Sequence, residues 1–290
     1  MLDTLLGFSL TLPAILTFLS ACLAIIAACT RLKTLATGLL VLTLAFATYY
    51  GFLQIWGLAA VVVLLISAVI FNRSNNKFIG MLTGCMIFIL AIAMLLHLVA
   101  GFVNPKVIDA IQISQGATTF TKYLNLDKII LGTILLIFVV PQGRRLFVQQ
   151  VSIPLIAFIF VTGICLILAV ITGLVSFEPK FPTIAGGWLL TNLFFTCYVE
   201  EAFFRGFIQV QLQKISNKNY WPTCVIVISG VLFGLAHLPG GAVYTLIASL
   251  TGSCYAYAYW RSNNIMLPIL MHFSFNCIHF FCFTYPFLSQ

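Results

Sequence analysis

Charge is what this sequence of 290 residues has least of. Lys, Arg, Asp and Glu together make up 7% of it, and only six residues are acidic. Soluble domains carry about 25% charged and about 45–50% apolar residues, whereas 62% of this chain is apolar. These values exclude an ordinary soluble fold, a disordered chain and a disulfide-rich scaffold. They indicate a protein that crosses a membrane several times.

Three further features are missing. None of the nine cysteines forms a CxxC pair, and all lie in apolar runs, so we expect them to be small buried side chains. The first 30 residues lack a basic start and a small-residue cleavage site, so the first apolar run is expected to be a retained span. The basic residues are scattered rather than clustered, which argues against a nucleic-acid partner.

Apolar runs near the length of about 20 residues that a span needs follow one another along the chain. They lie at about 5–29, 35–53, 55–71, 78–103, 128–142, 151–175, 187–212, 222–240, 243–260 and 265–287. The sequence therefore predicts an all-α fold, a polytopic transmembrane helix bundle of about ten spans. We expect an N-terminal extension of four spans (1–104), a connecting loop with a short surface helix (105–127), and a core of six spans (128–290).

The basic residues alternate between successive loops, which predicts the orientation in the membrane. Nine lie on one side: Arg31, Lys33, Arg73, Lys77, Arg144, Arg145, Lys214, Lys218 and Arg261. Four lie on the other: Lys106, Lys122, Lys128 and Lys180. This asymmetry predicts that the first set faces the cytoplasm and that both termini lie outside. The protein is expected in the plasma (inner) membrane if its source is bacterial.

Three charged residues fall within six positions of one predicted span, at Glu200, Glu201 and Arg205. A charge at mid-bilayer is unfavourable by roughly 2.5–3.5 kcal/mol on insertion scales, so such a cluster indicates function. Glu201 and Arg205 are four residues apart and can pair on one helix face. Glu200 is rotated by about 100° from Glu201 and has no cation nearby in the sequence. Solvated charges at a cytoplasmic helix end are the alternative.

A histidine in the next span is placed to meet this cluster. The polar turn at 216–219 lies midway between Glu200 and His237, so an antiparallel helix pair brings the two side chains nearly level. Phe233 precedes His237 by one turn and can pack beneath its ring. The following Pro-Gly-Gly at 239–241 interrupts the helix, and irregular backbone at depth lines cavities.

The last span carries His272 and Asn276, which are four residues apart and can present donors to one point. Hydrogen bonding between neighbouring helices is the structural alternative for such a pair. His279 continues the same face one turn later and is a weaker candidate. His97 has no polar companion in its span and is expected to be structural.

The ordered set Glu200-Glu201-xxx-Arg205, Phe233-xxx-His237 and His272-xxx-Asn276 resembles the CPBP intramembrane endopeptidases, a family that includes CAAX prenyl proteases and bacteriocin-processing enzymes. The likeness covers about residues 125–290, and the first four spans lie outside it. Each motif alone has low specificity, whereas the three in this order are highly specific.

The resemblance implies peptide-bond hydrolysis inside a membrane cavity, with a membrane-embedded or membrane-anchored protein or peptide as substrate and the lipid bilayer as surroundings. Glu200 would be the general base and His237 would help to hold the attacking water. His272 and Asn276 would stabilise the oxyanion. Glu201 and Arg205 would form a structural pair. No cofactor is expected.

Three other interpretations stay open. Glu200, His237 and His272 are also a credible zinc set of two histidines and one carboxylate. A non-catalytic immunity or adaptor protein could bind a peptide without cleaving it. A proton-coupled transporter could use the same groups as a relay, although no inverted pair of broken spans supports this.

Overall fold

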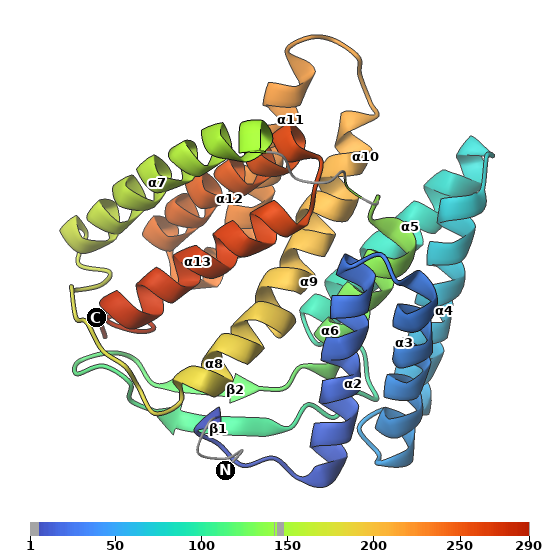
Figure 1. The fold of residues 1–290 in the computed structure, drawn as a ribbon, viewed down its shortest axis with the longest axis horizontal. Helices are drawn as coiled ribbons and strands as arrows, with labels where there is room; N and C mark the ends of the chain where they lie inside the picture. The colour runs from blue at the N-terminus through green and yellow to red at the C-terminus, as the bar shows by residue number, and fades with distance from the viewer. Residues whose placement is uncertain (1–5, 142, 144–147, 290) are drawn as a thin grey trace.

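The computed structural model describes residues 6–141, 143 and 148–289. Helices make up most of these residues, which confirms the expected all-α membrane helix bundle (Figure 1). The helices are α2 (Leu12–Cys29), α3 (Lys33–Tyr49), α4 (Ile55–Arg73), α5 (Lys77–Leu95), α6 (Leu126–Ile134), α7 (Val148–Ile171), α8 (Ala185–Asn192), α9 (Tyr198–Glu201), α10 (Val210–Gln213), α11 (Trp221–Leu235), α12 (Ala242–Ser262) and α13 (Met266–Cys282). Three π-helical stretches, η1 (Leu135–Val139), η2 (Leu193–Cys197) and η3 (Ala202–Gln209), continue these helices, and η4 (Leu238–Gly240) is a 3₁₀ turn.

Four of the described helices are long and apolar enough to cross a membrane: α2, α4, α5 and, within α7, Gln150–Ile171. Helices α3, α11 and α13 are apolar but have only 17, 15 and 17 residues. Because a span needs about 20 residues, the shorter helices alone do not establish further crossings. The chain is an integral membrane protein, and the count of ten spans stays a prediction.

The apolar core runs without a break from the first helices to the last. It joins buried side chains of α2 to α5 with those of α6, α9, η1 to η3, α12 and α13. Phe18 of α2 lies 5.6 Å from Phe195 of η2, and Phe88 of α5 stacks on Phe203 of η3 at 6.0 Å, both measured between ring centroids. The N-terminal helices thus pack directly on the helix that carries the acidic pair, and the division of the chain near residue 104 stays a prediction.

Small residues bring α11 and α12 into close contact. A methyl group at Gly234 would lie 1.9 Å from Ser249 Oγ, and one at Gly230 would lie 2.0 Å from Ser253 Oγ. Only glycine therefore fits at these two positions, and its lack of a side chain lets the two backbones approach closely. This contact fixes the turn between the two helices, which contains His237.

The segment 105–127 forms a two-stranded antiparallel sheet, so the expected surface helix is wrong. Strand β1 (Lys106–Ile111) pairs with β2 (Phe120–Tyr123), with Lys106 opposite Tyr123. β-Branched residues of β1 favour an extended backbone, and Gly116 has a φ of +71° in the connection between the strands.

This hairpin closes one end of the bundle together with two other segments. Residues 172–184 and the C-terminal tail 283–289 pair with each other at Phe177 and Phe283, and the tail pairs with the hairpin at Leu288 and Ala117. We call these three segments the cap. Its apolar side packs on the ends of α8 and α13 through Ile108, Trp188 and Phe280. Figure 1 shows the hairpin crossing beneath these helix ends.

The two predicted sets of basic residues lie at opposite ends of the molecule. The helix turns at the end opposite the cap carry Arg31, Lys33, Arg73, Lys77, Lys214, Lys218 and Arg261 (Figure 1). Arg144 and Arg145 lie outside the described residues. Lys106, Lys122 and Lys180 belong to the cap, and Lys128 lies near the start of α6. We call the end opposite the cap the basic end. Its cytoplasmic location stays a prediction.

The orientation can be tested with single cysteines in a cysteine-free background. Lys218→Cys at the basic end should be shielded in intact cells from an impermeant thiol reagent, whereas Gln115→Cys in the cap should react. Both positions are exposed, so access to the protein surface is matched. Labelling of Lys218→Cys from outside, with Gln115→Cys silent until the cells are permeabilised, would reverse the predicted topology.

Candidate active site

Both glutamates of the predicted site lie in α9, a short α-helical stretch between the π-helical stretches η2 and η3. Together with α8 and α10 these stretches form one continuous helix from residue 185 to 213. π-Helical turns inside α-helices are frequent at functional sites because they change the direction in which successive side chains point. Here they flank Glu200 and Glu201 on both sides.

Glu200 and His237 meet as the position of the intervening turn predicts. Glu200 Oε2 lies 4.0 Å from His237 Nε2, and the two side chains are 20% and 21% exposed. Glu200 Oε2 is buried and has no hydrogen-bond partner within the described part of the chain. The expected helix interruption is also present, since α11 ends just before His237 and η4 follows it.

The hydrogen bonding of His237 shows which of its two ring nitrogens carries the hydrogen. The other nitrogen faces Glu200. Its Nδ1 lies 2.8 Å from the carbonyl oxygen of Phe233, and a carbonyl accepts only, so Nδ1 carries the hydrogen. In the neutral ring Nε2 is then an acceptor, and it faces the acceptor oxygen of Glu200. The predicted packing is confirmed, because the Phe233 and His237 rings are 4.6 Å apart.

Glu201 and Arg205 form the predicted ion pair and are fully buried. Arg205 Nε lies 3.1 Å from Glu201 Oε2, and Arg205 Nη1 donates to Glu201 Oε1 over 3.2 Å. Arg205 Nη2 also donates to the carbonyl oxygen of Gly252, at 2.7 Å. The guanidinium group lies 4.5 Å from the centre of the Phe233 ring, which adds a cation–π contact.

Glu201 has a second partner that the sequence did not predict. His272 Nδ1 lies 2.9 Å from Glu201 Oε1, and the histidine side chain is 5% exposed. The His272 ring also stacks on Tyr255, with centroids 5.1 Å apart, and meets the Phe233 ring edge-on at 5.5 Å. Phe233 therefore lies between the two histidines of the site, one in the turn after α11 and one in α13.

Asn276 is held by a residue that the sequence analysis missed. Its Nδ2 donates to Asn192 Oδ1 at 3.2 Å and approaches Cys197 Sγ at 3.7 Å. Cys197 Sγ in turn donates to Asn192 Oδ1 at 3.3 Å. Asn192 could have been predicted as part of the site because it is an amide side chain in an otherwise apolar span. Tyr255 could have been predicted because it is an aromatic residue on the helix that follows His237.

The two remaining histidines lie outside the site. His97 is structural, as expected: it finds a partner outside its own span, since its Nδ1 lies 2.5 Å from Asp127 Oδ2 of α6. Asn104 also donates to Asp127, so this cluster ties the end of α5 to the start of α6. His279 lies 3.2 Å from the carbonyl oxygen of Thr284 and contacts the cap.

The cap places a lysine within electrostatic reach of Glu200. Burial of Lys122 in β2, and next the charge of the neighbouring Lys128, lower the pKa of its ammonium group to about 8, while Cys197 and Glu200 act in the opposite direction. The hairpin, more than 75 residues earlier in the chain, thus brings a basic side chain into the electrostatic surroundings of Glu200.

Fold and site together define a multi-pass membrane protein with a polar, partly buried cluster of carboxylate, imidazole and amide groups. Residues 182–278 match the family model described as Type II CAAX prenyl endopeptidase Rce1-like. This segment is about a third of the chain and contains all seven residues of the predicted site. No curated protein and no solved structure matches the chain.

The family match confirms the resemblance to the CPBP intramembrane endopeptidases, which was based on the three motifs in this order. The matched family consists of peptidases, hydrolases that act on a membrane-associated protein, and this region of the chain is similar to them. The matched segment begins just before α8 and ends within α13, so it spans every helix that contributes a site residue.

Glu201→Gln should destabilise the protein, because it leaves the buried Arg205 guanidinium without a counter-charge. Breaking a buried pair costs about 3–5 kcal/mol, which corresponds to a fall in melting temperature of about 10 °C. Thermal unfolding of the purified protein in detergent measures the change, with the exposed Lys218→Gln as control. An unchanged melting temperature for Glu201→Gln would show that the pair does not support the fold.

Proposed function

We propose that this protein is an intramembrane endopeptidase of the glutamic type, in which Glu200 activates a water molecule for attack on a peptide bond of a membrane-anchored protein. The observation that carries the proposal is the buried Glu200 Oε2, which has no hydrogen-bond partner among the described residues and lies 4.0 Å from the acceptor His237 Nε2. Two acceptors this close require a donor between them.

A water molecule fits this gap. If the water oxygen lies about 2.8 Å from both acceptors, the angle between the two acceptors at that oxygen is roughly 90°. This is close to the H–O–H angle of water. Both water hydrogens would then point at acceptors, and the oxygen lone pairs would face away toward the substrate. The fixed Nδ1–H bond of His237 to Phe233 keeps Nε2 available for this role.

In the proposed reaction the water oxygen forms a bond to the scissile carbonyl carbon while one water proton moves to Glu200. The tetrahedral intermediate carries its negative charge on the former carbonyl oxygen. Its C–N bond then breaks, and the proton held by Glu200 passes to the leaving amine. The products are a carboxylic acid and an amine, and Glu200 is again ionised.

His272 and Asn276 are the proposed donors to the oxyanion. Asn276 Nδ2 has two hydrogens, of which Asn192 takes one, and Cys197 is only a weak acceptor for the other. His272 donates its Nδ1–H to Glu201, so donation from Nε2 requires a second proton on the ring. Glu201 is the counter-charge for that imidazolium, which gives it a positioning role beside its structural one.

The arrangement of donors favours this mechanism over zinc. A catalytic zinc ion needs three protein ligands, each at about 2.0–2.2 Å. Among the described residues, no group of three His, Cys, Asp or Glu side chains is placed to hold a metal ion. His272, the third member of the alternative zinc set, is directed at Glu201 and not at Glu200.

The substrate is proposed to reach the site from the cap end. His237 lies in the turn between α11 and α12, and the ring of Tyr244 in the first turn of α12 contacts both His237, at 5.5 Å, and Phe287 of the cap, at 5.1 Å. With the basic end in the cytoplasm, cleavage would take place in the outer half of the bilayer. This favours a substrate that is anchored in the membrane and exposed on the outside.

Glu200→Gln is expected to separate catalysis from folding. It keeps the side-chain volume and removes a charge with no direct ion-pair partner, so the melting temperature should equal or exceed that of wild type. Turnover should fall by at least 10²–10⁴-fold, the contribution of a general base. Quantitative comparison of membrane peptides from cells that produce wild type or Glu200→Gln measures cleavage, with Lys218→Gln as the matched control.

Three results would contradict the proposal. Normal cleavage by Glu200→Gln, together with a stable but inactive Glu201→Gln, would exchange the roles of the two glutamates. Loss of wild-type cleavage in chelator that only added Zn²⁺ restores would favour the zinc alternative. If wild type and Glu200→Gln cells have identical peptides, a non-catalytic adaptor or immunity role gains support.

Asn276→Ala should lower turnover by about 10²–10³-fold with little effect on substrate binding, because it deletes a donor that acts on the transition state. Asn192→Ala leaves Asn276 in place and removes its orienting acceptor, so a smaller fall in kcat with an unchanged KM is expected. Cleavage kinetics on an identified substrate peptide measure both. Wild-type kcat in Asn276→Ala would remove this residue from the mechanism.

A further inference from the structure

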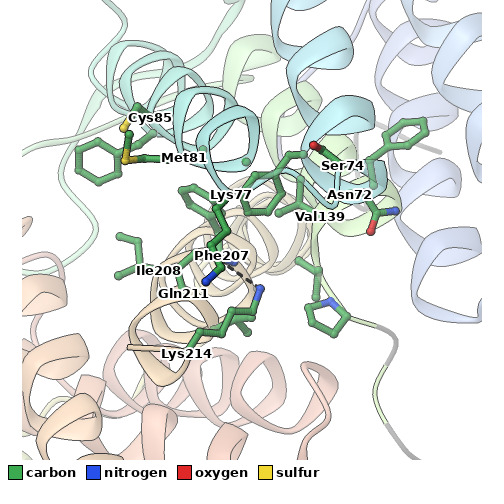
Figure 2. A pocket seen from close by; sticks show the side chains of 18 of the residues that line it. Asn72, Ser74, Lys77, Met81, Cys85, Val139, Phe207, Ile208, Gln211 and Lys214 are labelled. Atoms are coloured by element: carbon green, nitrogen blue, oxygen red, sulfur yellow. Dashed lines mark hydrogen bonds between the residues drawn. The ribbon is translucent and has the colours of Figure 1, made fainter. Parts of the chain in front are cut away.

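The described part of the chain contains a cavity of about 1130 Å³ that is separate from the candidate active site. It lies at the basic end, between the α4–α5 turn, the end of η1, and the helix formed by η3 and α10 (Figure 2). Drug-sized ligands occupy pockets of roughly 300–1,000 Å³, so this groove is large enough for a bigger molecule. We call it the basic groove.

Three lysines line the basic groove, Lys33, Lys77 and Lys214, and no carboxylate among the described residues does. The described carboxylates are engaged elsewhere: Asp109 with Lys106, Asp127 with His97, Glu178 with Lys180, and the two glutamates of the candidate active site. The groove therefore has a positive charge that the described part of the protein does not neutralise.

The lysines lie above an apolar wall. Figure 2 shows Lys77 and Lys214 directed toward the same region beside Gln211, to which Lys214 Nζ donates at 3.2 Å. The rest of the lining is largely apolar and includes Phe71, Met81, Phe88, Phe138, Phe207 and Ile208. A ligand that matches this surface has an anionic head beside the ammonium groups and an apolar body along the helices.

The outer face of α5 indicates where such a ligand comes from. Phe78, Met81, Leu82 and Ile89 are all strongly exposed on this membrane-length helix, as expected of side chains that contact hydrocarbon. The groove thus opens toward the bilayer interior along α5, and its basic rim lies at one membrane surface. Basic pockets between spans on the cytoplasmic side attract anionic lipid headgroups.

We propose that the basic groove is a binding site for one anionic glycerophospholipid, with its phosphate at Lys77 and Lys214 and an acyl chain against Met81, Phe88 and Phe207. Lys33 adds a third charge at the rim. This site is independent of the proposed peptidase reaction, and it stabilises the outer side of the helix that carries Glu200.

The test uses the full chain, purified in a neutral detergent, with added dioleoylphosphatidylglycerol or dioleoylphosphatidylcholine. Native mass spectrometry measures the lipid bound, and thermal unfolding measures stabilisation. Wild type should bind phosphatidylglycerol at least tenfold more tightly than phosphatidylcholine. The double variant Lys77→Gln/Lys214→Gln should lose this preference, and Arg73→Gln/Lys218→Gln, with the same charge change outside the groove, should keep it.

A second variant tests the apolar part without altering charge. Gly80 lines the groove, and a Cβ at this position meets nothing within 4 Å, so Gly80→Leu can be accommodated and extends into the groove. It should weaken phosphatidylglycerol binding severalfold while the protein stays folded.

Three outcomes would overturn the proposal. Equal loss of preference in both double variants would assign it to the general surface charge of the basic end. Glycerol 3-phosphate that stabilises the protein as much as the lipid does would make the groove a site for soluble phosphate. Unchanged lipid binding in Gly80→Leu would place the acyl chain elsewhere.

Discussion

The buried guanidinium group of Arg205 is the constraint on which the candidate active site depends. A charge in the interior of a membrane protein is tolerated only when partners surround it, and here they come from several helices. Glu201 supplies the opposite charge, Gly252 of α12 a carbonyl oxygen, and Phe233 of α11 an aromatic face. Through Glu201 the same network reaches His272 of α13. Satisfying one cation therefore sets the mutual positions of four helices, and Glu200 is directed at the adjoining space.

Local spacing made part of this site predictable. Residues four apart on a helix share a face, which was enough to predict the pair of Glu201 with its arginine. The meeting of Glu200 and His237 followed from their equal distances to one polar turn. The contact of His272 with Glu201 and the support from Asn192 depend on how distant helices are rotated against each other, and sequence periodicity does not fix that rotation. The hairpin of β1 and β2 was missed for a similar reason, because its strands are stabilised by the ends of α8 and α13 and by the tail.

One helix connects the candidate active site with the basic groove. Its buried side carries Glu201 and Arg205 toward α11, α12 and α13, while Phe207 and Gln211 line the basic groove on the other side. The Phe88–Phe203 stack and the contact of Phe71 with Phe207 bind this helix to α4 and α5. The N-terminal helices, which lie outside the matched family segment, thus form the wall against which the helix that carries Glu200 is held. Because they pack on this helix, the N-terminal helices can influence the position of the site residues although they contribute none themselves.

The two π-helical stretches around α9 bear on how chain length can vary in this protein. Each wide turn accommodates one residue more than an α-helical turn does, and removing a residue from an α-helix rotates everything beyond it by about 100°. A single-residue deletion in η3 after Arg205 is absorbed by tightening the π-helix to an α-helix, so α10 keeps nearly the same direction and Gln211 stays at the groove. The acidic pair and its arginine would keep their spacing. Related chains that differ by one residue here would then preserve both the site and the groove, so alignments of this helix should allow a gap between residues 206 and 209.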